Sequence, residues 1–166
     1  IDLAKAKPGT LNYGSGGAGS GTHLAAELFK SMAGVNLVHV PYKGTGPAVI
    51  ALLGSQIELI FASGPTVAAH IKSGKLRALA VTSAQPTALA PGVPPRAASG
   101  LPGYQVVAAI ALFAPAKTPR AIINQLSQET ARVLKRTDVK QRFFDSGAET
   151  VGGSPEELTA MIMADF

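Results

Sequence analysis

The feature that most constrains the fold is an alternation of short apolar segments with segments of helical period. The helical segment 22–33, for example, carries Leu24, Leu28, Phe29 and Met32 on one face and stops at Gly34. The apolar segments have the length of strands and lie at 35–42, 57–62, 76–82 and 106–114. This alternation predicts an α/β fold with a mixed, mainly parallel sheet and helices on both faces. We expect 57–62 and 76–82 to be buried central strands, because both runs are apolar on both faces.

The length and composition are those of a packed globular protein. The chain has 166 residues, 46% of them hydrophobic, and contains no Trp, so Ala, Val, Leu and Ile must build the core. After 106–114 we expect three helices: one that begins after Thr118-Pro119, one over 138–146, and a C-terminal one. Ser154 and Glu157 predict a capping box at the start of the C-terminal helix. We expect the helix after Pro119 to have an inner face of Ile122, Ile123, Leu126, Thr130, Val133 and Leu134. The length suits one complete domain plus part of a second.

Charge and cysteine content exclude several kinds of protein. The formal net charge is +5, but most Lys and Arg residues stand singly, and the basic cluster at 132–142 lies on an amphipathic helical segment. This pattern indicates a solvated helix face, and we expect no nucleic-acid partner. The absence of Cys excludes thiol catalysis and cysteine metal sites. No apolar run approaches the roughly 20 residues that span a bilayer.

The stretch LNYGSGGAGSGTHLA, residues 11–25, contains G-x-G-x-x-G between a predicted strand and a predicted helix. A dinucleotide site also needs an acidic residue about 20 positions further on. The segment 37–43 has none, and the best helix caps, Ser20 and Thr22, lie beyond the third glycine. A dinucleotide-binding enzyme domain is therefore disfavoured. Consecutive glycine amides, hydroxyl groups and a helix N-terminus favour a small anion such as a carboxylate, the alternative being a glycine-rich turn without a ligand.

An enzyme would require a nucleophile with a base, a carboxylate pair or a metal cluster. Ser15 stands in a glycine turn, but the G-x-S-x-G pattern of a nucleophile elbow is absent there. No His stands at metal-ligand spacing to another His, Asp or Glu in a loop, and the acidic residues fall mostly on helix ends or polar faces. We therefore expect no catalytic residue, no metal and no cofactor.

Several motifs together resemble those of one family. The stretch GSGGAGSGTHLAAELFKSMAGVNLVHVPYKG, then HIKSGKLRALAVTS, LPGY and LFAPAKTP, resembles the Bug family of extracytoplasmic solute-binding proteins of tripartite tricarboxylate transporters. The resemblance implies a periplasmic-binding-protein fold of type II, in which two α/β domains close on a small carboxylate. It also implies a periplasmic location and delivery of the ligand to membrane permease subunits.

The resemblance further implies a domain division. Residues 1–106 would form the second, ligand-cradle domain, and 107–166 would cross back and complete part of the first domain. An N-terminal segment of the family would precede this sequence. We expect the crossing segment 106–114 and the helix 119–135 to expose apolar surface and favour self-association. The effector-binding domain of a LysR-type transcriptional regulator, a related fold, is the alternative.

The site residues that the resemblance implies fall in three loops. The first loop would hold the carboxylate, mainly through backbone N–H groups, and consists of Ser15, Gly16, Gly17, Ala18, Gly19, Ser20, Thr22 and His23. The turn Tyr42-Lys43-Gly44 and the pair Ala62-Ser63 would face the same cleft. Many relatives have an Asp-Asn pair after the strand that here ends Phe61-Ala62-Ser63-Gly64, and the absence of that Asp weakens the case for an amino-acid ligand. The ligand that the resemblance implies is a small carboxylate: a di- or tricarboxylate or an aromatic acid. His39 alternates with Val38 and Val40, which favours a packing role over ligand contact.

Overall fold

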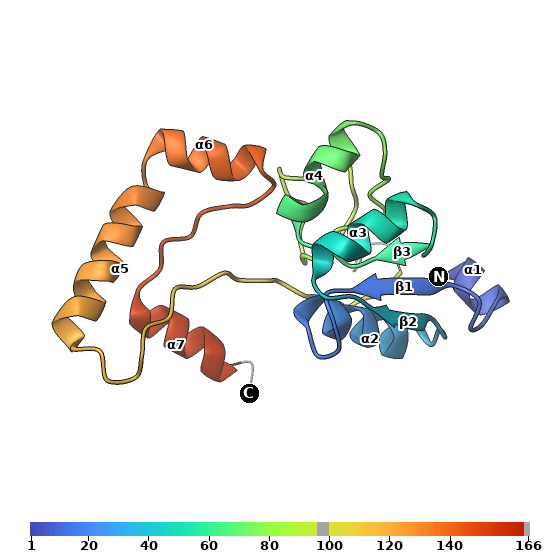
Figure 1. Ribbon diagram of the computed structural model, residues 1–166, viewed down its shortest axis with the longest axis horizontal. Coiled ribbons are helices and arrows are strands. Elements are labelled where there is room, and N and C mark those ends of the chain that lie inside the picture. The colour runs from blue at the N-terminus through green and yellow to red at the C-terminus, as the bar shows by residue number, and fades with distance from the viewer. Residues whose placement is uncertain (96–99, 165–166) are drawn as a thin grey trace. The chain divides into compact units, whose positions relative to one another are not determined.

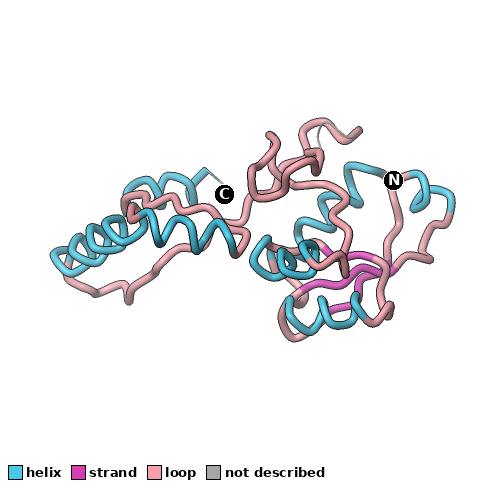
Figure 2. The backbone as a smooth tube through the Cα atoms, turned by 90° about the horizontal axis from the view of Figure 1, so that it is seen from above, coloured by secondary structure: helices cyan, strands magenta, loops and turns pink. Residues whose placement is uncertain are grey.

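The computed structural model describes residues 1–95 and 100–164. The chain divides into two compact units, Ile1–Ala108 and Ala109–Phe166. Figure 2 shows that the strands of the described residues all belong to the first unit, whereas the second unit consists of helices and loops. Whether the two units correspond to the two predicted domains stays a prediction.

The first unit is built on a small parallel sheet. Its central strand is β1 (Asn12–Ser15), flanked by β2 (Val38–Pro41) on one side and β3 (Leu59–Ile60) on the other. The helices of this unit are α1 (Asp2–Ala6), α2 (Gly21–Ala33), α3 (Thr45–Leu53) and α4 (Gly64–Lys72). Figure 1 shows α2 and α3 on opposite faces of the sheet. The predicted α/β class with helices on both faces is confirmed.

Local sequence signals explain where α2 begins and ends. Ser20 is the N-cap, with its hydroxyl accepting the N–H of His23 at 3.3 Å. At the other end Gly34 adopts a left-handed conformation with φ 62°, which closes the helix. The predicted boundaries of this helix are therefore confirmed, and the first turn of α2 is fixed directly beside the glycine loop.

The core differs from the predicted helix face. The residues of α2 that are buried are Ala25, Ala26 and Ala33, whereas Leu24, Leu28 and Met32 are exposed, so the predicted inner face is wrong apart from Phe29. Because the buried side chains of α2 are all alanines, there is room beside the helix for Tyr104. Tyr104 is fully buried and donates its hydroxyl hydrogen to the carbonyl oxygen of Ala25 at 3.0 Å. Phe29 meets Tyr104 edge-on with ring centroids 6.1 Å apart. The LPGY segment thus fills the space that larger helix residues would occupy.

The predicted central strands 57–62 and 76–82 are wrong in extent and place. Only Leu59 and Ile60 form a strand, at an edge of the described sheet, with Glu58 adding one N–H bond to Asn12 O at 3.1 Å. In 76–82 the structure has a single bridge, Val81 to Pro95, and Leu79 is 70% exposed. Thr82 bonds to Val106 instead of to a neighbouring strand of the sheet. An apolar run reports a tendency toward burial, whereas a strand also needs a partner backbone at hydrogen-bonding distance.

The second unit contains α5 (Arg120–Leu134), α6 (Thr137–Asp145) and α7 (Pro155–Ala164). The predicted capping box of α7 is confirmed: Ser154 Oγ accepts the N–H of Glu157 at 3.1 Å, and Glu157 accepts the N–H of Ser154 at 2.7 Å. None of the residues of α5 is fully buried: within the predicted inner face, Ile123 and Leu134 are half-buried, whereas Ile122, Leu126, Thr130 and Val133 are exposed. The segment 106–114 is not a paired strand in the described structure, and its Ile110 is 95% exposed.

Candidate functional site

The loops with the predicted site residues follow the carboxyl ends of the strands. In parallel sheets these ends lie at one edge, where the next helices begin. The loop after β1 holds residues 15–20, the loop after β2 holds 42–44, and the loop after β3 holds 62–63. The first two are joined directly, because Tyr42 donates its N–H to Ser15 O at 3.1 Å and Gly44 donates to Gly16 O at 3.2 Å. The described structure gives no hydrogen bond between 62–63 and the glycine loop.

Several backbone N–H groups of the glycine loop donate to side chains of the loop or of the first turn of α2. Gly16 N–H donates to Thr22 Oγ1 at 2.9 Å, Gly17 N–H to Ser15 Oγ at 3.1 Å and Gly19 N–H to His23 Nδ1 at 3.1 Å. The predicted site residues Ser15, Thr22 and His23 thus act here as acceptors that shape the loop. Sequence spacing placed these residues in the loop but gave no indication of this internal pairing.

Three other amides are left with their N–H groups unused. Among the described residues, the N–H groups of Ala18, Gly21 and Thr22 make no hydrogen bond. Gly21 and Thr22 are the first two residues of the 13-residue helix α2, so the helix dipole adds positive potential at these donors. Unpaired amides at a helix N-terminus are a favourable environment for a carboxylate.

Glycine is required at two positions of the loop by backbone conformation. Gly17 has φ +125° and Gly19 has φ +75°, both in the region that side chains rarely adopt. At Gly16 the reason is space, since a Cβ atom would lie 3.1 Å from Thr45 Oγ1 at the start of α3. The loop conformation therefore depends on glycine for two separate reasons.

Beneath the loop lies a stack of three aromatic rings. His39 of β2 lies 4.9 Å from Tyr13 of β1 and 4.1 Å from His23 of α2, measured between ring centroids. Ser15 is fully buried, and its Oγ lies 2.7 Å from His39 Nε2. The predicted packing role of His39 agrees with this arrangement, but sequence reasoning missed its bond to Ser15. The pairing of Tyr13 with His39 in the strand register is the signal that could have revealed the stack.

Charged groups border this stack on α2. Glu27 accepts hydrogen bonds from the Tyr13 hydroxyl at 2.5 Å and from Lys30 Nζ at 2.7 Å, and these bonds hold the pKa of Glu27 below its usual range. Burial, together with Glu27, raises the pKa of Tyr13, which stays protonated. Burial, with His23 nearby, lowers the pKa of His39 and favours its neutral form. The ion pair of Glu27 with Lys30 therefore borders the stack, next to the neutral rings of Tyr13 and His39.

The loop residues themselves are free of negative charge. Neither 15–23 nor 42–44 contains Asp or Glu, and Lys43 is exposed in the turn after β2. The described residues contain no group of three His, Cys, Asp or Glu that could hold a metal ion. In the part of the chain that the structure describes, no helix has the length and apolarity needed to cross a membrane.

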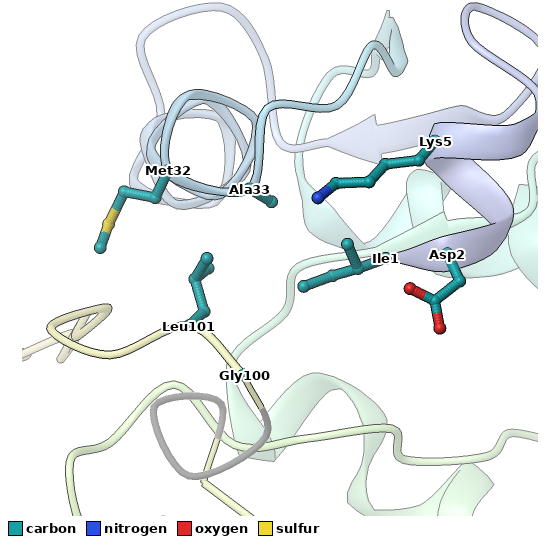
Figure 3. A pocket seen from close by; sticks show the side chains of 7 residues that line it. All are labelled: Ile1, Asp2, Lys5, Met32, Ala33, Gly100 and Leu101. Atoms are coloured by element: carbon teal, nitrogen blue, oxygen red, sulfur yellow. The ribbon is translucent and has the colours of Figure 1, made fainter.

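Two hollows in the described part of the chain lie away from the glycine loop. One of about 400 Å³ is lined by residues from α1, the end of α2 and the LPGY segment (Figure 3): Ile1, Asp2, Lys5, Met32, Ala33, Gly100 and Leu101. It lies about 18 Å along α2 from the free amides, at 1.5 Å per residue. Another of about 550 Å³ lies between α5 and α7 in the second unit. Neither contains a predicted site residue, so the loop chemistry, and not cavity volume, identifies the candidate site.

Comparison with known proteins connects this geometry to a family. The family model described as "Tripartite tricarboxylate transporter family receptor" matches residues 1–165. A Pseudomonas sp. (strain P51) protein, "UPF0065 protein in tcbD-tcbE intergenic region", is 36% identical over 166 residues, which cover 99% of this chain and 49% of that protein. The chain thus spans about half the length of this relative.

Solved structures give the same result. The structure "R. palustris Rpa4515 with adipate" matches with a TM-score of 0.94 and 33% identity, covering 99% of this chain and 55% of that one. The structure of MatC from Rhodopseudomonas palustris with bound malate matches with a TM-score of 0.85 and 30% identity, at 99% and 55% coverage. The expected periplasmic-binding-protein fold is confirmed. The chain belongs to the receptor family of the tripartite tricarboxylate transporters, the Bug and TctC solute-binding proteins.

Proposed function

We propose that this chain supplies the carboxylate-binding wall of a periplasmic receptor for a small di- or tricarboxylate. The observation that carries this proposal is the set of unused N–H groups at Ala18, Gly21 and Thr22, next to a glycine loop whose shape is fixed from within. Amides of fixed direction at a helix N-terminus bind an anion without reorganising. Lys43 in the adjoining turn adds positive charge at the same edge.

The proposal follows the ligands found with two similar structures, adipate and malate. One carboxylate of such a ligand would bind the free amides, and the rest would extend away from the loop. In the same proposal Tyr42 and Gly44 border the site, Ala62 and Ser63 lie at its edge, and membrane permease subunits receive the loaded protein. Family membership supports this assignment over the effector domain of a LysR-type regulator and over a dinucleotide-binding enzyme domain.

The proposal is tested by titrating the isotope-labelled chain with adipate or malate and following backbone amide signals by NMR. We expect saturable shifts at Ala18, Gly21 and Thr22. The neutral diamide of adipate is the matched control and should cause none, since the donors recognise charge. Absence of saturable shifts with every di- and tricarboxylate, or saturation of the same amides by NAD alone, would refute the proposal.

A single substitution removes one donor while keeping the helix start. Gly21 is the first residue of α2, the position at which proline is favoured, and Ser20 has ψ 157°, which a following proline requires. Gly21→Pro therefore deletes one N–H with little change in backbone. We expect at least about tenfold weaker adipate binding, from the loss of one charge-assisted hydrogen bond. Unchanged affinity would show that this amide does not contact the ligand.

A further inference from the structure

One side-chain hydrogen bond closes the glycine loop onto the helix that follows it. Gly16 donates its N–H to Thr22 Oγ1 at 2.9 Å, across six positions of the chain. The other side-chain acceptors of loop amides lie only two and four positions from their donors. Residues 16–22 therefore form a ring that the Thr22 hydroxyl closes. This ring contains all three free amides, those of Ala18, Gly21 and Thr22.

A second hydroxyl fastens the inside of the ring. Ser20 Oγ donates to Gly17 O at 2.7 Å, and the Ser20 N–H donates to the same carbonyl oxygen at 3.2 Å. Ser20 Oγ and Thr22 Oγ1 lie 3.0 Å apart, within hydrogen-bonding distance. Whichever of the two hydroxyls donates at this contact, it connects the closing bond at Gly16 to the bond at Gly17.

The main chain and the side chain of Thr22 have different partners. The N–H of Thr22 makes no hydrogen bond in the described structure, whereas its Oγ1 has two partners within the loop. Thr22 and Gly16 are half-buried, whereas Ala18 and Gly21 are exposed. The closing bond is therefore less accessible to a ligand than the amides of Ala18 and Gly21.

We propose that Thr22 is a positioning residue of the carboxylate site. Its hydroxyl closes the ring and thereby holds the amide of Ala18 beside the two free amides at the start of α2. This inference rests on the proposed function, and it assigns to the Thr22 side chain a role other than direct contact with the ligand.

The three free amides depend on the ring to different degrees. Gly21 and Thr22 belong to α2, so the helix fixes the direction of their N–H groups. Ala18 lies outside the helix, between Gly17 with φ +125° and Gly19 with φ +75°. Glycines have the most backbone freedom once their constraints are removed. The direction of the Ala18 amide is therefore the one that opening the ring would change.

The test is titration of the isotope-labelled chain with adipate in three variants. Thr22→Val removes the hydroxyl but keeps the β-branched shape and the backbone N–H. We expect it to bind adipate about tenfold more weakly, the effect of losing one charge-assisted hydrogen bond, that of Ala18. Thr22→Ser keeps the hydroxyl and should restore wild-type affinity. Thr82→Val is the matched control: it also loses a hydroxyl bonded within the chain, to Val106 O at 2.7 Å, and should leave the affinity unchanged.

The size of the amide shifts at saturating adipate separates positioning from ligand contact. In Thr22→Val we expect Ala18 to lose its adipate-induced shift, whereas Gly21 keeps it. A hydroxyl that touched the carboxylate directly would instead weaken binding while both amides reached their wild-type shifts at saturation. That result would overturn the inference, and so would an adipate affinity of Thr22→Val equal to that of wild type.

A second measurement needs no ligand. In the free protein, hydrogen exchange at the Gly16 amide should be at least about fivefold faster in Thr22→Val than in wild type or Thr22→Ser, because this amide loses its acceptor. If wild type shows no saturable shift with any carboxylate, the proposed function fails, and Gly16 exchange alone decides whether Thr22 closes the ring. Equal exchange rates in wild type and Thr22→Val would overturn the inference.

Discussion

Replacing Gly19 by alanine should weaken carboxylate binding while the fold persists. Gly19 has φ +75°, and a Cβ atom there would meet nothing within 4 Å, so the penalty is conformational and not steric. A non-glycine residue in the left-handed region costs about 1–2 kcal/mol. The variant loop either stays strained or relaxes to negative φ, which breaks the Gly19 to His23 bond and redirects the neighbouring amides.

If the binding-competent loop becomes less populated by that free energy, the apparent Kd for adipate rises about 5- to 30-fold. The assay is the NMR titration, combined with thermal unfolding. Gly74→Ala is the matched control, because Gly74 has φ +70° and equally open space but lies after α4, away from the loop. Both variants should lower Tm by about 2–8 °C, and only Gly19→Ala should lose affinity. An affinity within twofold of wild type, alongside equal losses of stability, would refute the role of this conformation.

Two further predictions concern packing and surface. Tyr104→Ala should lower the free energy of unfolding by about 3–5 kcal/mol in denaturant titration, because it empties a fully buried site. Tyr104→Phe should lower it by only about 1 kcal/mol, through loss of the hydrogen bond to Ala25. Equal losses in the two variants would contradict the packing argument. The chain should self-associate through its exposed apolar segment, and replacing Ile110 and Phe113, which are 95% and 71% exposed, by lysine should reduce the particle size in light scattering. A wild-type chain that is monomeric at high concentration would contradict this expectation.

The sequence by itself determined the local features of the fold. The ends of α2 followed from Ser20 and Gly34, and the start of α7 from Ser154 and Glu157, because a cap depends on residues a few positions apart. The α/β class followed from the alternation of strand and helix patterns. The sequence also argued against a dinucleotide turn, since 37–43 contains no acidic residue and the caps lie beyond the third glycine. That the glycine loop holds a carboxylate stays a prediction.

Only the tertiary structure decided which groups of the site are engaged. Sequence order cannot show that His39, 24 residues from Ser15, lies within hydrogen-bonding distance of the Ser15 hydroxyl. Nor can it show that four loop amides, those of Gly16, Gly17, Gly19 and Ser20, are paired internally. The N–H groups of Ala18, Gly21 and Thr22 stay unused. Sequence order likewise could not show that Tyr104 packs against the alanine face of α2, leaving Leu24 and Leu28 exposed. Hydrophobic periodicity reports which residues tend to be buried. Which neighbour buries or pairs with them depends on contacts between segments distant in the chain, and those exist only in the folded molecule.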